Sequence, residues 1–127
     1  MIVNTVKKVL VGNVFPFALI LADVNIRVVS IEVVREALAG AEIFSFWGHN
    51  ATQIAAEKLL GVSLQPRTNR PALELSPEGL PSLYDEVFNV CWVCAPNYRS
   101  GFRPLIGQEV AAEDILGWHT LRMNWVH

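Results

Sequence analysis

The order of apolar and polar residues along the chain predicts short strands that alternate with helices. An apolar run over Lys8–Val14 is typical of a strand, and Pro16 ends it because proline has no N–H for a sheet ladder. Arg27–Ser30 is predicted as a second short strand. Ser30 is also a preferred helix N-cap, and the apolar positions after it indicate a helix that ends at Gly40.

The middle of the chain repeats this order of strand and helix. Ala41–Phe46 is predicted as a strand, Asn50 as the N-cap of the next helix, and Gly61 as the end of that helix. The alternation over Pro71–Ser76 predicts a further strand. Ser76–Glu86 contains two prolines and a glycine, so it is the most loop-like part of the chain.

The last third of the chain predicts a long apolar strand and a terminal strand. Val87–Ala95 indicates a buried central strand, Pro96–Pro104 a turn, and Val110–Leu116 a short helix. His119–His127 alternates again as a strand. The chain is therefore expected to be a single domain, 1–127, of the α/β or α+β class, with a mixed five- to six-stranded sheet flanked by about three helices.

The composition adds an expectation about assembly. Of the residues, 52% are hydrophobic and 17% are charged, whereas about 25% are charged in an average protein. A small domain with so little charge leaves apolar surface uncovered. Four tryptophans point the same way, because Trp is enriched at contact surfaces. We therefore expect a homodimer or a larger homo-oligomer.

Charge and hydropathy exclude two classes of partner. The net charge of −2 argues against binding of long nucleic acid through a basic face, although it is compatible with a small phosphorylated ligand. A membrane helix needs roughly 18–20 apolar residues, and the longest candidate, Val9–Val24, is interrupted by Gly12, Asn13, Pro16 and Asp23. The first residues also lack the order of a signal peptide. We therefore expect a cytoplasmic protein without a membrane partner.

Cys91 and Cys94 form a C-x2-C pair, a spacing that also occurs in zinc sites. A structural zinc site needs four ligands, and the sequence holds no second pair. Residues three apart on a strand point to opposite faces of the sheet. We therefore expect two buried core thiols rather than a metal site, and no cofactor.

The strongest candidate for chemistry lies where the second strong strand meets its helix. The first turn of a helix has free N–H groups that attract phosphate, and Gly48 lets a ligand approach the backbone. The imidazole of His49 exchanges protons near neutral pH, and Thr52 adds a hydroxyl donor. From these residues alone an alternative stays open, in which Gly48 is a turn and His49 or Asn50 a helix cap.

This segment resembles the viral ring nuclease family, the anti-CRISPR proteins directed against type III systems. That family shows Gly-His-x-Ala/Ser-Thr at a helix start, then a Leu/Cys-Gly-Val/Thr step, then Asn-Arg before a strand. The corresponding residues here are Gly48–Thr52, Leu60–Val62, and Asn69 with Arg70. The first strand, which ends at Asn13, is similar to the first strand of the family.

The resemblance implies a homodimer that encloses cyclic tetra-adenylate, the second messenger of type III CRISPR defence, across its two-fold axis. It implies cleavage without metal, with a ribose 2′-OH as nucleophile and His49 as proton donor to the leaving 5′ oxygen. Each subunit then supplies one such histidine to a symmetric ring. The candidate ligand-binding residues are Asn13, Gly48, Asn50, Thr52, Asn69, Arg70, Arg99 and Arg103.

Several of these residues have a structural interpretation as well. Arg70 either reaches a phosphate or pairs with Glu42 or Glu74. Tyr98 and Phe102 flank a basic turn, where they either stack on a base or cover the core. Both interpretations remain open from the sequence.

The turn after the long central strand departs from the family. The family carries an Arg followed three residues later by Glu-Gly, whereas Asn97–Gly101 places Ser100 at the Glu position and shifts the Arg to Arg99. Serine cannot orient or deprotonate a 2′-OH as glutamate does, so this departure favours a sponge that holds the messenger uncleaved. Arg99 and Arg103 remain phosphate donors or solvated arginines. A protein-binding module is the third hypothesis.

Overall fold

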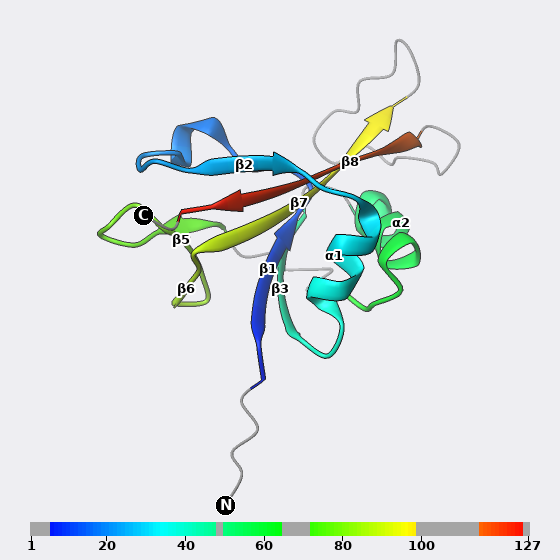
Figure 1. Ribbon diagram of the computed structural model, residues 1–127, viewed down its shortest axis with the longest axis horizontal. Coiled ribbons are helices and arrows are strands. Elements are labelled where there is room, and N and C mark those ends of the chain that lie inside the picture. Colours follow the sequence, from blue (N-terminus) through cyan, green and yellow to red (C-terminus); the bar gives the residue numbers. More distant parts are fainter. Residues whose placement is uncertain (1–5, 48–49, 65–71, 99–114, 126–127) are drawn as a thin grey trace, which may run out of the picture.

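A five-stranded mixed sheet forms the centre of the molecule. The computed structural model describes residues 6–47, 50–64, 72–98 and 115–125 (Figure 1). The sheet has the strand order β2-β8-β7-β1-β3. Its strands are β1 (Lys8–Gly12), β2 (Asn25–Val28), β3 (Glu42–Phe46), β7 (Val90–Tyr98) and β8 (Ile115–Asn124). Because β1 is parallel to β3 and β7 while β8 is antiparallel to β7 and β2, the predicted mixed sheet of an α+β fold is confirmed.

Two helices, α1 (Ile31–Leu38) and α2 (Asn50–Leu60), cover one face of this sheet. Ser30 caps α1, because its Oγ accepts a hydrogen bond from the backbone N–H of Val33. Gly40 and Gly61 follow the two helices at φ values of 69° and 70°, a conformation that glycine adopts without steric cost. The predicted start and stop signals of both helices are therefore confirmed to within about a residue.

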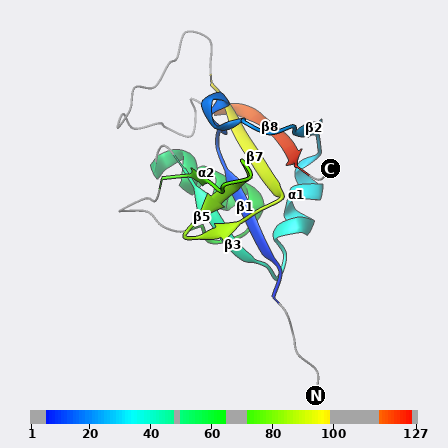
Figure 2. The same cartoon turned by 90° about the vertical axis from the view of Figure 1, so that its left-hand side faces the viewer.

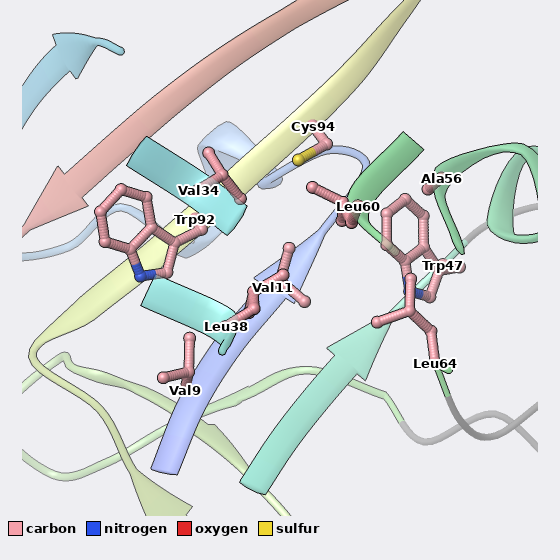
Figure 3. Packing of buried hydrophobic residues seen from close by; sticks show 10 residues of the cluster. All are labelled: Val9, Val11, Val34, Leu38, Trp47, Ala56, Leu60, Leu64, Trp92 and Cys94. Atoms are coloured by element: carbon pink, nitrogen blue, oxygen red, sulfur yellow. The ribbon is translucent and has the colours of Figure 1, made fainter. Parts of the chain in front are cut away.

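The core on the helix side joins both helices to the strands (Figure 3). Its buried members are Val9, Val11, Val34, Leu38, Trp47, Ala56, Leu60, Leu64, Trp92 and Cys94. Alternate positions of β1 and β7 supply the strand side chains, because successive residues of a strand point to opposite faces. Burial of these side chains, at about 25 cal/mol per Å² of apolar surface, is what holds α1 and α2 to the sheet.

A second, smaller sheet covers the opposite face (Figure 2). It has the order β4-β5-β6 and consists of β4 (Glu74–Leu75), β5 (Pro81–Leu83) and β6 (Glu86–Val87). The segment that contains the 3-10 helix η1 (Phe17–Leu19) packs on the same side. The buried members of this core are Leu10, Phe15, Phe46, Leu83, Phe88, Cys91, Val93, Met123 and Trp125. The molecule thus has three layers, with the large sheet in the middle.

The expectation of a loop over Ser76–Glu86 was wrong, because β5 and the first residue of β6 lie inside that segment. Tyr84 and Asp85, at φ values of 50° and 64°, form the two-residue connection between these strands. Positive φ at both central residues is the geometry of a type I′ hairpin, which usually selects Asn-Gly. The tertiary packing imposes this turn on Tyr-Asp, so the sequence carries little sign of it.

The prediction of a third helix over Val110–Leu116 was also wrong at the end of that range. Ile115 and Leu116 belong to β8, which pairs with β7 as far as Tyr98, while residues 110–114 lie outside the described residues. β7 likewise runs through Pro96, where a turn was predicted. β1 pairs with β7 only as far as Val93, so β7 has one free side at Pro96 and tolerates a residue without N–H.

Candidate functional site

The carboxyl ends of the parallel strands meet at one edge of the large sheet. Gly12, the last residue of β1, lies between Phe46, the last residue of β3, and Val93 of β7. The chain after each of these strands therefore emerges at the same edge. Open sheets with parallel strands bind ligands at this edge, outside the carboxyl ends of the strands. We call it the carboxyl edge.

Asn13 directly follows β1 at the carboxyl edge. Its side chain is only 9% exposed and lines a cavity of about 320 Å³ between the segment Asn13–Phe17 and strands β2, β7 and β8. Among the described residues, Asn13 is the polar member of an otherwise apolar lining, which includes Val93 and Leu121. A cavity of this type suits a flat apolar group that carries a few polar atoms at its edge.

The position of Asn13 depends on a close contact one residue earlier. A Cβ atom added to Gly12 would overlap the ring of Phe46, which lies on the neighbouring strand. Glycine therefore leaves the space at the end of β1 that the Phe46 ring occupies. The Phe46 ring in turn packs edge-on against Phe15, which lies two residues beyond Asn13.

The start of α2 lies at the same edge. Its first residue is Asn50, and the first turn of the helix contains no acidic side chain. Thr52 is fully buried, and its Oγ1 has no hydrogen-bond partner among the described residues. The same is true of Nε1 of the buried Trp47. A buried polar group without a partner costs about 1–3 kcal/mol. Two such groups, on Trp47 and Thr52, therefore flank residues 48–51 in the sequence, where the chain passes from β3 into α2.

The other predicted site residues lie outside the described residues. These are Gly48, His49, Asn69, Arg70, Arg99 and Arg103, together with Ser100 and the side chain of Asn50. Their proposed roles stay predictions. Of the predicted set, the structure describes the side chains of Asn13 and Thr52 and brings Asn13 to the edge where α2 begins.

The two cysteines lie on opposite faces of β7, as their spacing predicted. Cys91 belongs to the core on the side of the small sheet, and Cys94 to the core on the helix side. Burial raises the pKa of the Cys94 thiol to about 12 and that of Cys91 further, and the nearby Cys94 adds to the second shift. Both thiols are therefore protonated near neutral pH and packed as apolar groups.

Two features of this edge were missed from the sequence. Trp47 is buried and directly precedes Gly48 in the sequence. Its closeness in sequence to the candidate histidine could therefore have been noticed from the sequence alone. The apolar cavity had none, because segments far apart in the chain, from Asn13 to Met123, build it together.

Comparison with known proteins found no match, because no protein-family model and no curated protein matches the chain. The resemblance to viral ring nucleases stays a prediction from the sequence, based on the Gly48–Arg70 segment and on Asn13. Among the described residues, the helices are too short or too polar to cross a membrane.

Proposed function

We propose that the protein binds a cyclic nucleotide second messenger at the carboxyl edge, within a homodimer cleft, and cleaves it with His49. The resemblance names cyclic tetra-adenylate as the messenger. The parallel register of β1 with β3 is the observation that carries the proposal. Gly12 lies opposite Phe46, so Asn13 follows one strand end and the segment that leads into α2 follows the neighbouring one. A site that uses Asn13 together with the start of α2 requires this arrangement.

The beginning of α2 supports binding of a phosphodiester. α2 has 11 residues, and its free N–H groups carry partial positive charge at its amino end. The first turn lacks acidic side chains, so no carboxylate competes with a bound phosphate there. The unpartnered hydroxyl of Thr52 lies in the same part of the helix.

The cavity beside Asn13 supports binding of a base. The amide of an Asn side chain is suited to the edge of an adenine, since it carries one donor and one acceptor side by side. The apolar walls of the cavity, about 320 Å³ in volume, suit the faces of the ring.

The proposed chemistry needs no metal. A ribose 2′ oxygen attacks the adjacent phosphorus, so that the bond from phosphorus to O2′ forms and the bond to O5′ breaks. The 2′-OH proton leaves to solvent, and His49 gives a proton to the departing 5′ oxygen. The products are a 2′,3′-cyclic phosphate and a 5′-OH.

Ser100 favours a second function, a sponge that binds the messenger without cleaving it. Where the family carries a carboxylate, this chain has a hydroxyl that cannot take the 2′-OH proton comparably. Binding through Asn13, Arg99 and Arg103 does not depend on that carboxylate.

The homodimer is proposed on the apolar surface around β2. Phe17 is 87% exposed and Val28 85% exposed, and Leu21 is also largely exposed. Phe17 and Ile26 both line the cavity beside Asn13, so this surface is continuous with the proposed ligand site. Burial of such side chains against a second copy is the usual role of an exposed apolar patch. A protein-binding module would use the same surface for a different partner.

One experiment separates these functions. The purified protein is incubated in EDTA with a panel of cyclic oligonucleotides and cyclic ADP-ribose isomers, and the products are separated by chromatography. Linear products with 2′,3′-cyclic phosphate ends support the nuclease. Intact ligand that is released only by heating supports the sponge and excludes cleavage. Absence of binding to any member of the panel overturns both and leaves the protein-binding module.

The proposed location is the cytoplasm, or the host cytoplasm if the protein is viral, because the second messenger that the resemblance names acts inside the cell. Fractionation of cells that express the full chain tests the location. Recovery in the membrane fraction would contradict it.

A further inference from the structure

A second pocket lies at the other end of β1. Its volume is about 280 Å³, and it opens at the amino ends of β1 and β7, beside β6 and β8. The five residues of β1 separate it from the carboxyl edge, a distance of about 13 Å at the usual rise of a strand. This amino-end pocket is therefore distinct from the site proposed for the cyclic nucleotide.

The lining of the amino-end pocket is cationic. Lys7, Lys8 and Arg122 line it, against a single carboxylate, that of Glu86. The protein as a whole has a net charge of −2, so this local excess of positive charge runs against the average of the chain. The apolar part of the lining includes the ring of Trp92.

A row of three side chains across the sheet concentrates the charge further. Trp92 of β7 lies opposite Arg122 of β8, which lies opposite Arg27 of β2. Side chains directly opposite in antiparallel strands share one face, so the two arginines are neighbours. Like charges in such a pair repel each other, and a bound anion between them relieves the repulsion.

Arg122 is already positioned for a ligand. Its guanidinium carbon lies 5.7 Å from the centre of the Trp92 ring, a distance at which the ring face attracts the cation. Among the described residues, the guanidinium N–H groups have no hydrogen-bond or ion-pair partner. A guanidinium edge matches the spacing of two phosphate oxygens.

Arg27 and Arg122 have no acidic partner among the described residues. The ion pairs found there join Lys8 to Glu86 at 2.6 Å and Arg35 to Glu32 at 3.8 Å. The one carboxylate of the pocket is thus already bound to Lys8, and its hydrogen bond raises the pKa of that lysine. Lys7 and Arg122 are therefore left in the lining to hold an anion, with Arg27 beside Arg122.

We propose that the amino-end pocket binds a small organic phosphate. Arg122 holds the phosphate oxygens in the pocket, and Lys7 adds positive charge. Arg27 does not line the pocket but adds positive charge from its place beside Arg122. The apolar part of the ligand lies over the wall that contains Trp92. A volume of about 280 Å³ accepts a molecule rather than a lone ion. The proposal does not depend on the cyclic nucleotide site.

The test is a titration of the full-length, ¹⁵N-labelled protein followed by NMR. The probes are inorganic phosphate and phenyl phosphate, with sodium chloride at matched ionic strength as reference. We expect saturable shifts of the Arg122 and Trp92 side-chain N–H signals, with phenyl phosphate bound more tightly because its ring meets the apolar wall. Absence of a saturable shift with both phosphates overturns the proposal.

Variants locate the binding. Arg122→Gln should weaken phenyl phosphate binding by about tenfold or more, the usual worth of a charge-assisted contact. Arg27→Gln, on an exposed edge strand, should weaken it by a few-fold and provides a readout even if the first variant folds poorly. Lys58→Gln removes the same charge from an exposed position on α2 and should leave the affinity unchanged.

Two results would contradict the proposed phosphate site in the amino-end pocket. Equal affinity of the Arg27 and Arg122 variants and the native protein would show that these arginines do not hold the phosphate. An equal loss in Lys58→Gln would show that binding follows the total charge only. A His49→Ala variant should keep the titration unchanged, so failure of one site is distinguishable from failure of the other.

Discussion

The two ends of β1 differ in how they hold polar groups. At the carboxyl edge, Asn13 and Thr52 are buried, and the part of the chain that the structure describes offers no hydrogen-bond partner to the Oγ1 of Thr52. At the amino end, Lys8 and Glu86 pair at the surface while Arg122 rests on a tryptophan ring.

This difference separates two kinds of recognition. A buried polar group interacts strongly because little water surrounds it, so the ligand binding that we propose at the carboxyl edge should depend on the exact fit of the ligand to these groups. Exposed cations act over about 10 Å at 0.1 M salt and are screened as salt rises. Binding at the amino end should therefore be the more sensitive of the two to ionic strength.

The largest expected effect concerns the chemistry of the carboxyl edge. His49→Ala should lower the rate of messenger cleavage by about 10²–10⁴-fold, the usual contribution of a proton donor. His119→Ala is the matched control, because His119 is exposed on β8 and should not be needed. Chromatography of cyclic tetra-adenylate in EDTA measures both. Equal loss in the two variants, or none in His49→Ala, would contradict the role of His49.

The second effect tests the contact that positions Asn13. Gly12→Ala should destabilise the protein by about 1–3 kcal/mol, because the new methyl group collides with the ring of Phe46. Gly117→Ala is the control, since a Cβ there meets nothing within 4 Å. Urea denaturation gives the free energy of unfolding of each variant. Equal stability of both would show that the Phe46 ring can move aside without cost.

The third effect tests the unpartnered hydroxyl. Thr52→Val replaces that hydroxyl by a methyl group of similar shape and should raise the free energy of unfolding by about 1 kcal/mol. Thr120→Val should lower it by a similar amount, because the Thr120 hydroxyl donates to the carbonyl of Val29. If Thr52 contacts the messenger, its variant should also bind the messenger more weakly. A less stable Thr52→Val protein would mean that the hydroxyl has a partner in solution.

The smallest effect belongs to the amino end. Glu86→Gln removes an exposed ion pair with Lys8, so the urea midpoint should hardly change. The same change removes the carboxylate of the pocket, so affinity for phenyl phosphate should rise by about two- to threefold. The NMR titration measures that affinity. A fall in affinity would show that Glu86 orients Lys8 for the ligand.

Much of the helix side of the fold could be predicted because its signals are local. The cap at Ser30 and the stops at Gly40 and Gly61 each depend on a few neighbouring residues. The opposite placement of Cys91 and Cys94 follows from the two-residue period of a strand. These predictions needed no knowledge of what packs against them.

The strand pair β5–β6 and the far ends of β7 and β8 were missed because they depend on distant parts of the chain. Tyr84 and Asp85 adopt a turn that their types do not favour, since the strands on both sides are held by the core. Ile115 joins β8 because Tyr98 offers it a partner, which outweighs a weak local preference for helix.

The sequence by itself determined the α+β class, the capped helices, the faces of the cysteines and the candidate Gly48-His49 pair. Tertiary structure alone decided that Asn13 lies at the edge where α2 begins, that an apolar cavity forms beside it, and that Arg27, Arg122 and Trp92 stand in one row. The physical reason is the distance along the chain over which each kind of interaction acts. Caps and periodicity act within a turn or two of chain, whereas strand register joins residues almost a hundred positions apart and is set by which faces the core can bury.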